Sequence, residues 1–454
     1  MLAHRLLRQV LIGRGSASGV RLASSLATSG DKQAAAAEPT STPQSRVRPE
    51  SWSVDGHVFK PDEKWNLTPA IMALLDRHIH AQPGNPLNLI KQRIVNYFHK
   101  NYRKPGNRSP LFTVCDKEAR VVTNYDNFDS LLTPDDHVSR RRSDTYYVNA
   151  DHCLRAHTSA HQHKLMRQGF DNFLVVGDVY RRDEIDRTHY PCFHQMEGVR
   201  LYSADELFGK NSAEQFELFA NDNTRTPQKQ EGLSEDASKI LEIQLKATLE
   251  ELCVTLFGKD AQIRFVDAYF PFTHPSFEVE VFYEGKWLEV LGCGVMEQKI
   301  LTSAGVTNKV GWAFGLGLER LAMVLYSIPD IRLFWSHDSG FLSQFADKTP
   351  EEDYKFVPIS VHPQVYFDLS FWLPDRPTHE MSADVFDLIR TIGGNLVEQV
   401  NLVDEFTNKK TGKISHCYRI VYRSVDRALT KEEVNVIHKE IEKNLVDLYG
   451  VKIR

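Results

Sequence analysis

Residues 173–202 read FLVVGDVYRRDEIDRTHYPCFHQMEGVRLY, and this stretch decides the fold. It begins with the apolar run Phe173–Val176, continues through the polar segment Arg181–Tyr190, and ends with alternating residues from Phe193 to Leu201. An apolar run, a polar connection and an alternating run predict two antiparallel strands joined by a long loop. We therefore expect an antiparallel sheet built around this hairpin.

The second predicted strand carries polar side chains on a face that is otherwise apolar. Because side chains alternate along a strand, Phe193, Gln195 and Glu197 share one face with Val199 and Leu201. A carboxylate on such a face is costly unless it is paired. Two interpretations follow: a structural ion pair, or a pocket that holds a small cationic or amphipathic ligand.

Charge and cysteine content exclude some classes of protein. The 454-residue chain is long enough for two or three domains, and its formal net charge is −5. Since residues 1–50 are basic overall, the remainder is more acidic than this average, so a globally basic nucleic-acid binder is excluded. The six cysteines form no C-x-x-C pair, which argues against a zinc ribbon and suits a reduced compartment.

The first 30 residues have the composition of a mitochondrial transit peptide. Four arginines, at positions 5, 8, 14 and 21, precede the first acidic residue, Asp31, and leucines between them can form one side of an amphipathic helix. A disordered basic tail is the alternative. Residues 31–50 have the composition of an unstructured spacer. No apolar run in the sequence approaches the length that spans a membrane.

Periodicity predicts alternating helical and strand segments between residues 68 and 325. Helices are expected at 68–80, 86–102 and 236–257, with a shorter one at 161–166. Strands are expected at 144–148, 263–266, 277–282 and 287–291, and residues 203–235 are expected to form a loop.

Several short motifs in this region can carry chemistry. Phe270 and Phe272 flank a proline and form either a rigid wall or ordinary core packing. Glycines at 292, 294, 311, 315 and 317 permit close approach of backbone or ligand. Glu319 and Arg320 fall off the apolar face of the helix that follows. His157 and His161 have i, i+4 spacing, but the acid of the H-E-x-x-H motif is missing, so we expect no metal ligands here.

The end of the chain predicts a separate module after a linker at 338–360. Strands are expected at 365–373, 396–406, 414–423 and 451–453, and helices at 383–392 and 430–448. Thr430 and Glu433 form a capping box at the start of the second helix. The order βαββαβ is that of a ferredoxin-like fold.

Two segments together resemble the signature motifs of the class II aminoacyl-tRNA synthetases. Tyr180–Asp183 (YRRD) is similar to motif 2, and Gly315–Arg320 (GLGLER) is similar to motif 3. The longer strings GDVYRRDEIDRTHYPCFHQMEG and AFGLGLERLAM resemble the phenylalanyl-tRNA synthetases, and the basic start with the ferredoxin-like end resembles their single-chain mitochondrial form. The resemblance covers about residues 60–454. One departure is Asp183, where the family often has Glu.

The resemblance implies a fold, a reaction and a set of partners. The fold is α+β: a catalytic antiparallel sheet flanked by helices at 51–337, the linker at 338–360, and a ferredoxin-like anticodon-binding domain at 361–454. The reaction joins L-phenylalanine to tRNA(Phe) through a phenylalanyl-adenylate, with ATP and Mg²⁺. The implied protein is a monomer of the mitochondrial matrix with no membrane partner.

The resemblance also assigns roles to residues. Arg181 and Arg320 are the expected catalytic residues, at the α-phosphate and on the γ-phosphate side. Glu197 and Gln195 are expected to meet the ammonium group of the amino acid, and Glu289 to make an ATP or metal contact. The full expected set of substrate-binding residues is His157, Ser159, Ala160, His161, Gln162, Arg181, Thr188, His189, Tyr190, Phe193, Gln195, Met196, Glu197, Phe270, Phe272, Glu289, Phe314 and Arg320.

Three hypotheses about function remain open on the sequence. The first is the synthetase, and the second is a related enzyme that activates a carboxylate without charging tRNA. The third is an RNA-binding or assembly protein with an inactive core. Arg181, Glu197 and Arg320 disfavour the third hypothesis, and the C-terminal module disfavours the second.

Overall fold

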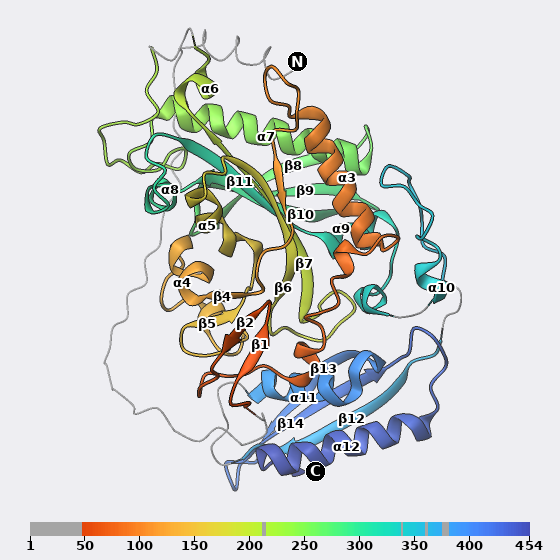
Figure 1. Cartoon of the computed structure of the whole chain (residues 1–454). Coiled ribbons are helices and arrows are strands. Elements are labelled where there is room, and N and C mark those ends of the chain that lie inside the picture. The colour runs from red at the N-terminus through yellow and green to blue at the C-terminus, as the bar shows by residue number, and fades with distance from the viewer. Residues whose placement is uncertain (1–47, 211–214, 337–338, 359–361, 375–380) are drawn as a thin grey trace. The chain divides into compact units, whose positions relative to one another are not determined.

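The structure is a computed structural model that describes residues 48–210, 215–336, 339–358, 362–374 and 381–454 (Figure 1). The predicted targeting segment and nearly all of the predicted spacer lie outside these described residues. Within the described ranges, no helix is both long enough and apolar enough to cross a membrane. All six cysteines are described, and all have free thiols.

The hairpin predicted at residues 173–202 is present. β6 (Asn172–Tyr180) and β7 (Cys192–Tyr202) pair antiparallel, with Val175 opposite Glu197 and Val179 opposite Phe193. Residues that pair in this way point to the same side of the sheet. Val175 is fully buried, and Glu197 beside it is only 4% exposed. The hairpin therefore holds a carboxylate in the interior, as the alternating pattern predicted.

The hairpin belongs to a seven-stranded sheet whose strand order is β3-β6-β7-β11-β10-β9-β8. All neighbouring pairs are antiparallel except β3 with β6, which is parallel. The remaining strands of this sheet are β3 (Thr113–Cys115), β8 (Gln262–Phe270), β9 (Thr273–Tyr283), β10 (Lys286–Met296) and β11 (Val310–Gly317). The prediction of an antiparallel sheet is confirmed, and its strands are longer than the apolar patterns indicated.

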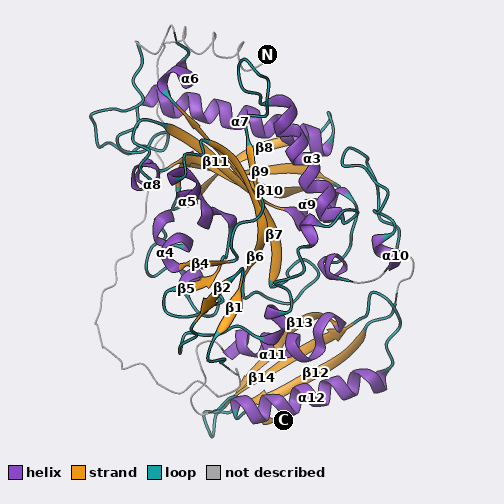
Figure 2. Cartoon of the chain, viewed as in Figure 1, coloured by secondary structure: helices purple, strands orange, loops and turns teal. Residues whose placement is uncertain are grey.

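Helices flank this sheet (Figure 2). The main core contains residues of α3 (Pro86–Asn101), α7 (Glu235–Phe257) and α9 (Leu318–Leu325), together with Val176 and Met196 from the hairpin. A second core contains residues of α5 (Gln162–Arg167) and α8 (Gln298–Ser303), together with Val175 and Val199. The two faces of the hairpin thus enter different cores. Glu197 lies on the second face, where the apolar packing stops.

The C-terminal module has the predicted βαββαβ order. Its strands β12 (Val365–Trp372), β13 (Val397–Thr407), β14 (Ile414–Tyr422) and β15 (Lys452–Ile453) form a sheet in the order β13-β14-β12-β15. Its helices are α11 (Met381–Gly393) and α12 (Lys431–Tyr449). A separate core joins the two helices to the sheet. Thr430 and Glu433 form the predicted capping box at the start of α12.

Smaller elements complete the described chain. The strands are β1 (Trp52–Val54), β2 (His57–Phe59), β4 (Val121–Thr123) and β5 (His152–Leu154). The α-helices are α2 (Pro69–Met72), α4 (Asn124–Asn127), α6 (Ala204–Phe208) and α10 (Ser339–Leu342). The 3₁₀ helices are η1 (Ile79–Ala81), η2 (Asp129–Leu131), η3 (Val138–Arg140), η4 (Thr158–His161), η5 (Ile331–Trp335) and η6 (Gly394–Leu396).

The structure corrects several local predictions. The helix predicted at 68–80 ends at Met72, and His78 has a left-handed backbone (φ 43°) that a continuous helix does not tolerate. No strand forms at 144–148; Tyr147 makes only an isolated bridge to Cys153. Glu319, predicted off the apolar face of its helix, is 3% exposed. In the predicted linker, Phe341 and Phe345 are fully buried in the main core.

Candidate active site

A cavity of about 570 Å³ opens where the second face of the hairpin loses its apolar cover. Its lining includes residues of β7, β9, β10 and β11, of the β8–β9 turn, of the loop after β6 and of the segment 133–145. Residues 156–159 complete the lining as a wall that faces β7. A second cavity of about 260 Å³ lies beside it and is lined by the loop after β6 and the start of α9. Arg181, Asp183, Gln195, Glu289, Gly292 and Gly315 line both cavities. The two cavities therefore form one continuous site.

Glu197 is the buried acid of the larger cavity. Its carboxylate accepts a hydrogen bond from the Thr158 hydroxyl (3.2 Å) and from the Gln162 amide. Burial raises the pKa of Glu197 to about 7, although hydrogen bonds from Ser159 and Thr158 lower it in part. In the part of the chain that the structure describes, no cationic side chain forms an ion pair with Glu197. A ligand cation in this cavity would supply the missing charge.

The wall opposite β7 is tied to the hairpin by backbone as well as side-chain groups. The Thr158 backbone N–H donates to the Gln195 side-chain oxygen at 3.4 Å, and Arg181 donates from Nε to the Ala156 carbonyl at 2.8 Å. His157 lies between these two contacts and lines the larger cavity. Burial and the nearby Arg181 lower the pKa of His157 to about 3, so its ring is neutral at pH 7. The wall therefore presents neutral polar groups around a single acid.

Aromatic rings form the far end of the larger cavity. Phe270 ends β8 and Phe272 lies in the turn before β9, and their rings stack with centroids 5.7 Å apart. Phe270 packs so closely over Gly292 that a Cβ there would lie 2.9 Å from the ring. Phe314 lies over Gly198, but on the opposite face of the sheet, where its ring stacks on Phe98 in the main core. Gly292 therefore makes room for one of the two rings at the apolar end of the cavity.

Arginines gather in the smaller cavity. The Arg181 guanidinium lies over the Phe193 ring, 5.1 Å from its centroid. Arg320 pairs with Glu289 at 3.2 Å, and both side chains are about half exposed. Thr188, His189 and Tyr190 complete the lining from the loop after β6. Two arginines beside an aromatic face suit a nucleotide that carries phosphates.

Internal hydrogen bonds order the loop after β6. Asp186 accepts hydrogen bonds from the backbone N–H groups of Thr188 (2.6 Å) and His189 (2.8 Å). The Tyr190 ring stacks on Trp335 at 5.4 Å. Asp183, the departure noted in the sequence, accepts the Glu184 N–H at 2.8 Å and lines both cavities. The shorter acid therefore reaches the site.

Most of the predicted site residues come together, and four do not. Among the described residues that line the two cavities, Ala160, His161, Gln162 and Met196 are absent. Gln162 acts on the site indirectly, through its hydrogen bond to Glu197. Met196 is fully buried in the main core, because alternation places it on the opposite face from Gln195 and Glu197. Ala160 packs in a small core, and His161 contacts Arg155.

Three residues that lie at the site were not singled out from the sequence. Thr158 binds the Glu197 carboxylate, and its place beside Ser159 was the available signal. Glu278 lines the larger cavity, and burial and the neighbouring Glu289 raise the pKa of Glu278. Arg182, adjacent to Arg181, also lines the larger cavity and ion-pairs with Asp384 and Asp387 of α11. Nothing local in the sequence distinguishes the two arginines.

Comparisons with known proteins agree with this geometry. The family model described as "tRNA synthetases class II core domain (F)" matches residues 73–209 and 219–345, and "Ferredoxin-fold anticodon binding domain" matches residues 360–454. These matches define a class II aminoacyl-tRNA synthetase core followed by an anticodon-binding domain.

Curated relatives narrow the class. The mitochondrial phenylalanine–tRNA ligase of Mus musculus is 51% identical over 400 residues, which cover 88% of each chain. The probable mitochondrial phenylalanine–tRNA ligase of Drosophila melanogaster is 49% identical over 438 residues, or 93% of this chain and 96% of that one. The chain therefore belongs to the mitochondrial phenylalanine–tRNA ligase family. A pyrrolysyl-tRNA synthetase structure from Desulfitobacterium hafniense (13% identity, TM-score 0.39, covering 60% of this chain and 80% of that one) adds nothing to this assignment.

Proposed function

We propose that the chain activates L-phenylalanine with ATP and transfers the phenylalanyl group to tRNA(Phe) in mitochondrial translation. The observation that carries the proposal is the continuity of two unlike cavities. One ends in stacked phenylalanines and holds the buried acid Glu197, and the other holds Arg181 and Arg320. An amphipathic amino acid fits the first and a triphosphate fits the second, with Arg181 where the reacting groups meet.

The proposed chemistry depends on positioning and charge. The phenylalanine carboxylate attacks the α-phosphorus of ATP, and the α-phosphorus–oxygen bond to the leaving pyrophosphate breaks. Arg181 binds the carboxylate and α-phosphate with its planar fork, while Arg320 binds the γ-phosphate side. Gln195 and Glu197 bind the ammonium group, which holds the carboxylate end toward Arg181. Holding both reactants in line removes much of the entropic barrier.

Glu278 and Glu289 would hold the Mg²⁺ that accompanies ATP. The described residues contain no cluster of three or more metal-binding side chains. Two nearby carboxylates fit the ion, because Mg²⁺ uses one or two carboxylates and takes its other ligands from phosphates and water. Burial and the neighbouring Glu289 raise the pKa of Glu278, and a bound cation would favour the ionised form of this acid. When bound, the ion would neutralise phosphate charge.

The remaining assignments follow from the family. We propose a catalytic domain at 51–337, a connecting segment at 338–360 whose Phe341 and Phe345 pack into the main core, and an anticodon-binding domain at 361–454 that contacts tRNA(Phe). We also propose a monomer of the mitochondrial matrix, with residues 1–50 as its targeting segment and spacer. A pure protein-interaction role for the C-terminal domain is the alternative.

Pyrophosphate exchange tests the proposed activity. Purified residues 50–454 should exchange labelled pyrophosphate into ATP only when phenylalanine is present. Leucine is the matched control, because it is apolar but lacks the ring that Phe270 and Phe272 would contact. Absence of exchange with phenylalanine, or equal exchange with leucine, contradicts the proposal.

A further inference from the structure

Arg155 lies buried along the edge of β6, beyond the point where β3 stops. β3 pairs with β6 only at Phe173–Val175. Farther along β6, the backbone of Arg155 takes over the edge: its carbonyl accepts the Tyr180 N–H at 3.0 Å, and its own N–H donates to the Arg120 carbonyl at 2.9 Å. The residue just before the wall is therefore fixed to the hairpin by a backbone hydrogen bond from Tyr180.

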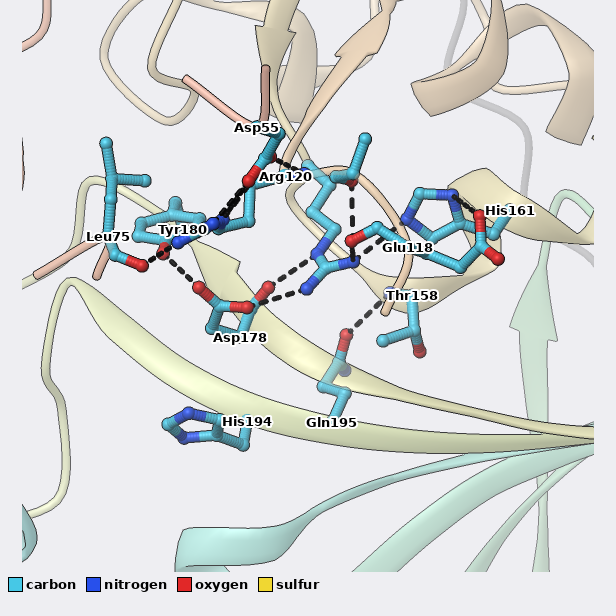
Figure 3. Close-up of polar contacts among 12 residues, drawn as sticks. Asp55, Leu75, Glu118, Arg120, Thr158, His161, Asp178, Tyr180, His194 and Gln195 are labelled. Carbon is cyan, nitrogen blue, oxygen red and sulfur yellow. Dashed lines mark hydrogen bonds and ion pairs between the residues drawn. The ribbon is translucent and has the colours of Figure 1, made fainter. Parts of the chain in front are cut away.

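The Arg155 guanidinium binds four groups, which belong to Asp178, Glu118 and His161. Figure 3 labels these three partner residues. Arg155 donates from Nε to the Asp178 carbonyl at 2.6 Å and from Nη2 to the Asp178 carboxylate at 2.7 Å. It donates from Nη1 to the Glu118 carbonyl at 3.0 Å and to Nε2 of His161, also at 3.0 Å. Arg155 is 2% exposed and Asp178 is 4% exposed. A charged pair at this depth is costly unless its hydrogen bonds are complete, and here they are extensive.

Asp178 stays ionised in this setting. Burial alone would raise the pKa of its carboxyl group, but Arg155, His194 and the Tyr180 hydroxyl hold it below its usual range. Removing either partner would leave the other charge buried and uncompensated.

Gly177 provides the space for the Arg155 side chain. A Cβ at this position would lie 2.1 Å from Nη2 of Arg155, so any other residue would push the guanidinium away. Gly177 pairs with Gln195, and both lie on the cavity side of the hairpin. The arginine therefore passes directly beside the strand pair that carries Gln195 and Glu197.

The wall of the larger cavity is the stretch between the two points that Arg155 holds. One point is Arg155 itself, and the other is His161, which receives Nη1. Between them, Thr158 contacts Gln195 and Glu197, and the Ala156 carbonyl receives Arg181. Neither Arg155 nor Asp178 is among the described residues that line the two cavities.

We propose that Arg155 and Asp178 are positioning residues, and that Gly177 lets them set the distance between the wall and β7, and with it the affinity for the ammonium group of the amino acid. This inference rests on the proposed function. Neither residue touches a substrate; both act through Thr158, Gln195 and Glu197.

We call Arg155, Asp178 and Gly177 together the clamp. Four variants test it by pyrophosphate exchange, and active-site titration gives the concentration of competent sites for each variant. Gly177→Ala and Arg155→Ala should each raise the KM for phenylalanine about tenfold or more, because small misplacements near reacting groups are costly. The KM for ATP should change less than twofold. The double variant should be no worse than Arg155→Ala, because the group that the new Cβ displaces is already gone. Asp178→Asn keeps the shape and should raise the KM for phenylalanine several-fold.

Leu174→Ala is the matched control for lost stability, since Leu174 is a fully buried core residue of the same strand. It should lower the melting temperature and leave both KM values unchanged. Three results would overturn the proposal. They are a lower melting temperature with unchanged KM values, equal rises in the KM values for phenylalanine and ATP, and additive effects in the double variant. If Arg155→Ala does not fold, Asp178→Asn and Gly177→Ala still decide. Wild-type enzyme without phenylalanine-dependent exchange would instead contradict the proposed function.

Discussion

The two cavities of the site handle charge in opposite ways. In the larger cavity, Glu197 is 4% exposed, and burial raises its pKa to about 7. In the smaller cavity, Arg320 and Glu289 form an ion pair in which each side chain is about half exposed. A buried acid without a cation favours a ligand that brings one, whereas a solvated ion pair separates at little cost when phosphates arrive. The degree of burial therefore distinguishes the proposed amino-acid cavity from the proposed ATP cavity more clearly than the types of residue do.

Replacing Glu197 should have the largest effect of the changes considered, and this effect should be on the binding of phenylalanine. Glu197→Ala removes the carboxylate that would pair with the substrate ammonium, and losing one partner of a buried charge pair costs about 2 to 5 kcal/mol, or roughly 30-fold or more. We expect the KM for phenylalanine to rise by that factor and the KM for ATP to change little, measured by pyrophosphate exchange at varied substrate. Glu197→Gln is the matched variant of equal size. A rise confined to the KM for ATP would contradict our division of the site.

Replacing Arg320 should affect the other cavity. Arg320→Ala removes a cation expected on the γ-phosphate side, and loss of one such contact costs on the order of a hundredfold in kcat/KM for ATP when it stabilises the transition state. Equilibrium binding of phenylalanine, measured by calorimetry without ATP, should be unchanged. Arg264→Ala is a suitable control, because the Arg264 side chain is about half exposed, pairs with a carboxylate (Glu280) and lines neither cavity within the described chain. Weaker phenylalanine binding by Arg320→Ala would contradict the assignment of ATP and phenylalanine to separate cavities.

The KM for phenylalanine should depend on pH through Glu197, and we expect this effect to be smaller than the effects of the two substitutions. With a pKa near 7, Glu197 is mostly ionised at pH 8 and mostly protonated at pH 6. The protonated acid cannot pair with an ammonium group, so the affinity for phenylalanine should fall as the pH falls through 7. We expect the KM for phenylalanine to rise about tenfold from pH 8 to pH 6, since each unit below the pKa removes about nine-tenths of the ionised form. Glu197→Gln should abolish this dependence; persistence in that variant would assign it to another group.

Local patterns predicted a large part of this molecule. The alternation in Phe193–Leu201 predicted the hairpin and the buried face of Glu197, and the same alternation, applied consistently, would have excluded Met196. The predictions of α3, α7 and the βαββαβ order of the C-terminal module were also confirmed. These elements were predictable because their apolar residues recur with a clear helical or strand period. The helix predicted at 68–80 ends at Met72, and the left-handed backbone of His78 rules out a continuous helix to residue 80. A single dihedral angle leaves no mark on periodicity.

Contacts between distant residues were the part that the sequence could not supply. Tyr147 resembles a strand residue, but its N–H binds the Asn66 side chain at 2.5 Å instead of a strand partner. Arg181 and Arg182 are neighbours of one type, and only the fold sends one to Ala156 and the other to Asp384 and Asp387. Arg155 and Asp178 meet in the same way. Such pairings depend on the tertiary structure and carry no local signal.

The most direct test of the account is a crystal structure with a non-hydrolysable phenylalanyl-adenylate analogue. The account predicts its ammonium group within hydrogen-bond distance of Glu197 and Gln195, its phenyl ring against Phe270 and Phe272, and its phosphate mimic at Arg181. An analogue bound with its ammonium group away from Glu197, or with its adenosine in the larger cavity, would contradict the assignment of phenylalanine to the larger cavity and ATP to the smaller one.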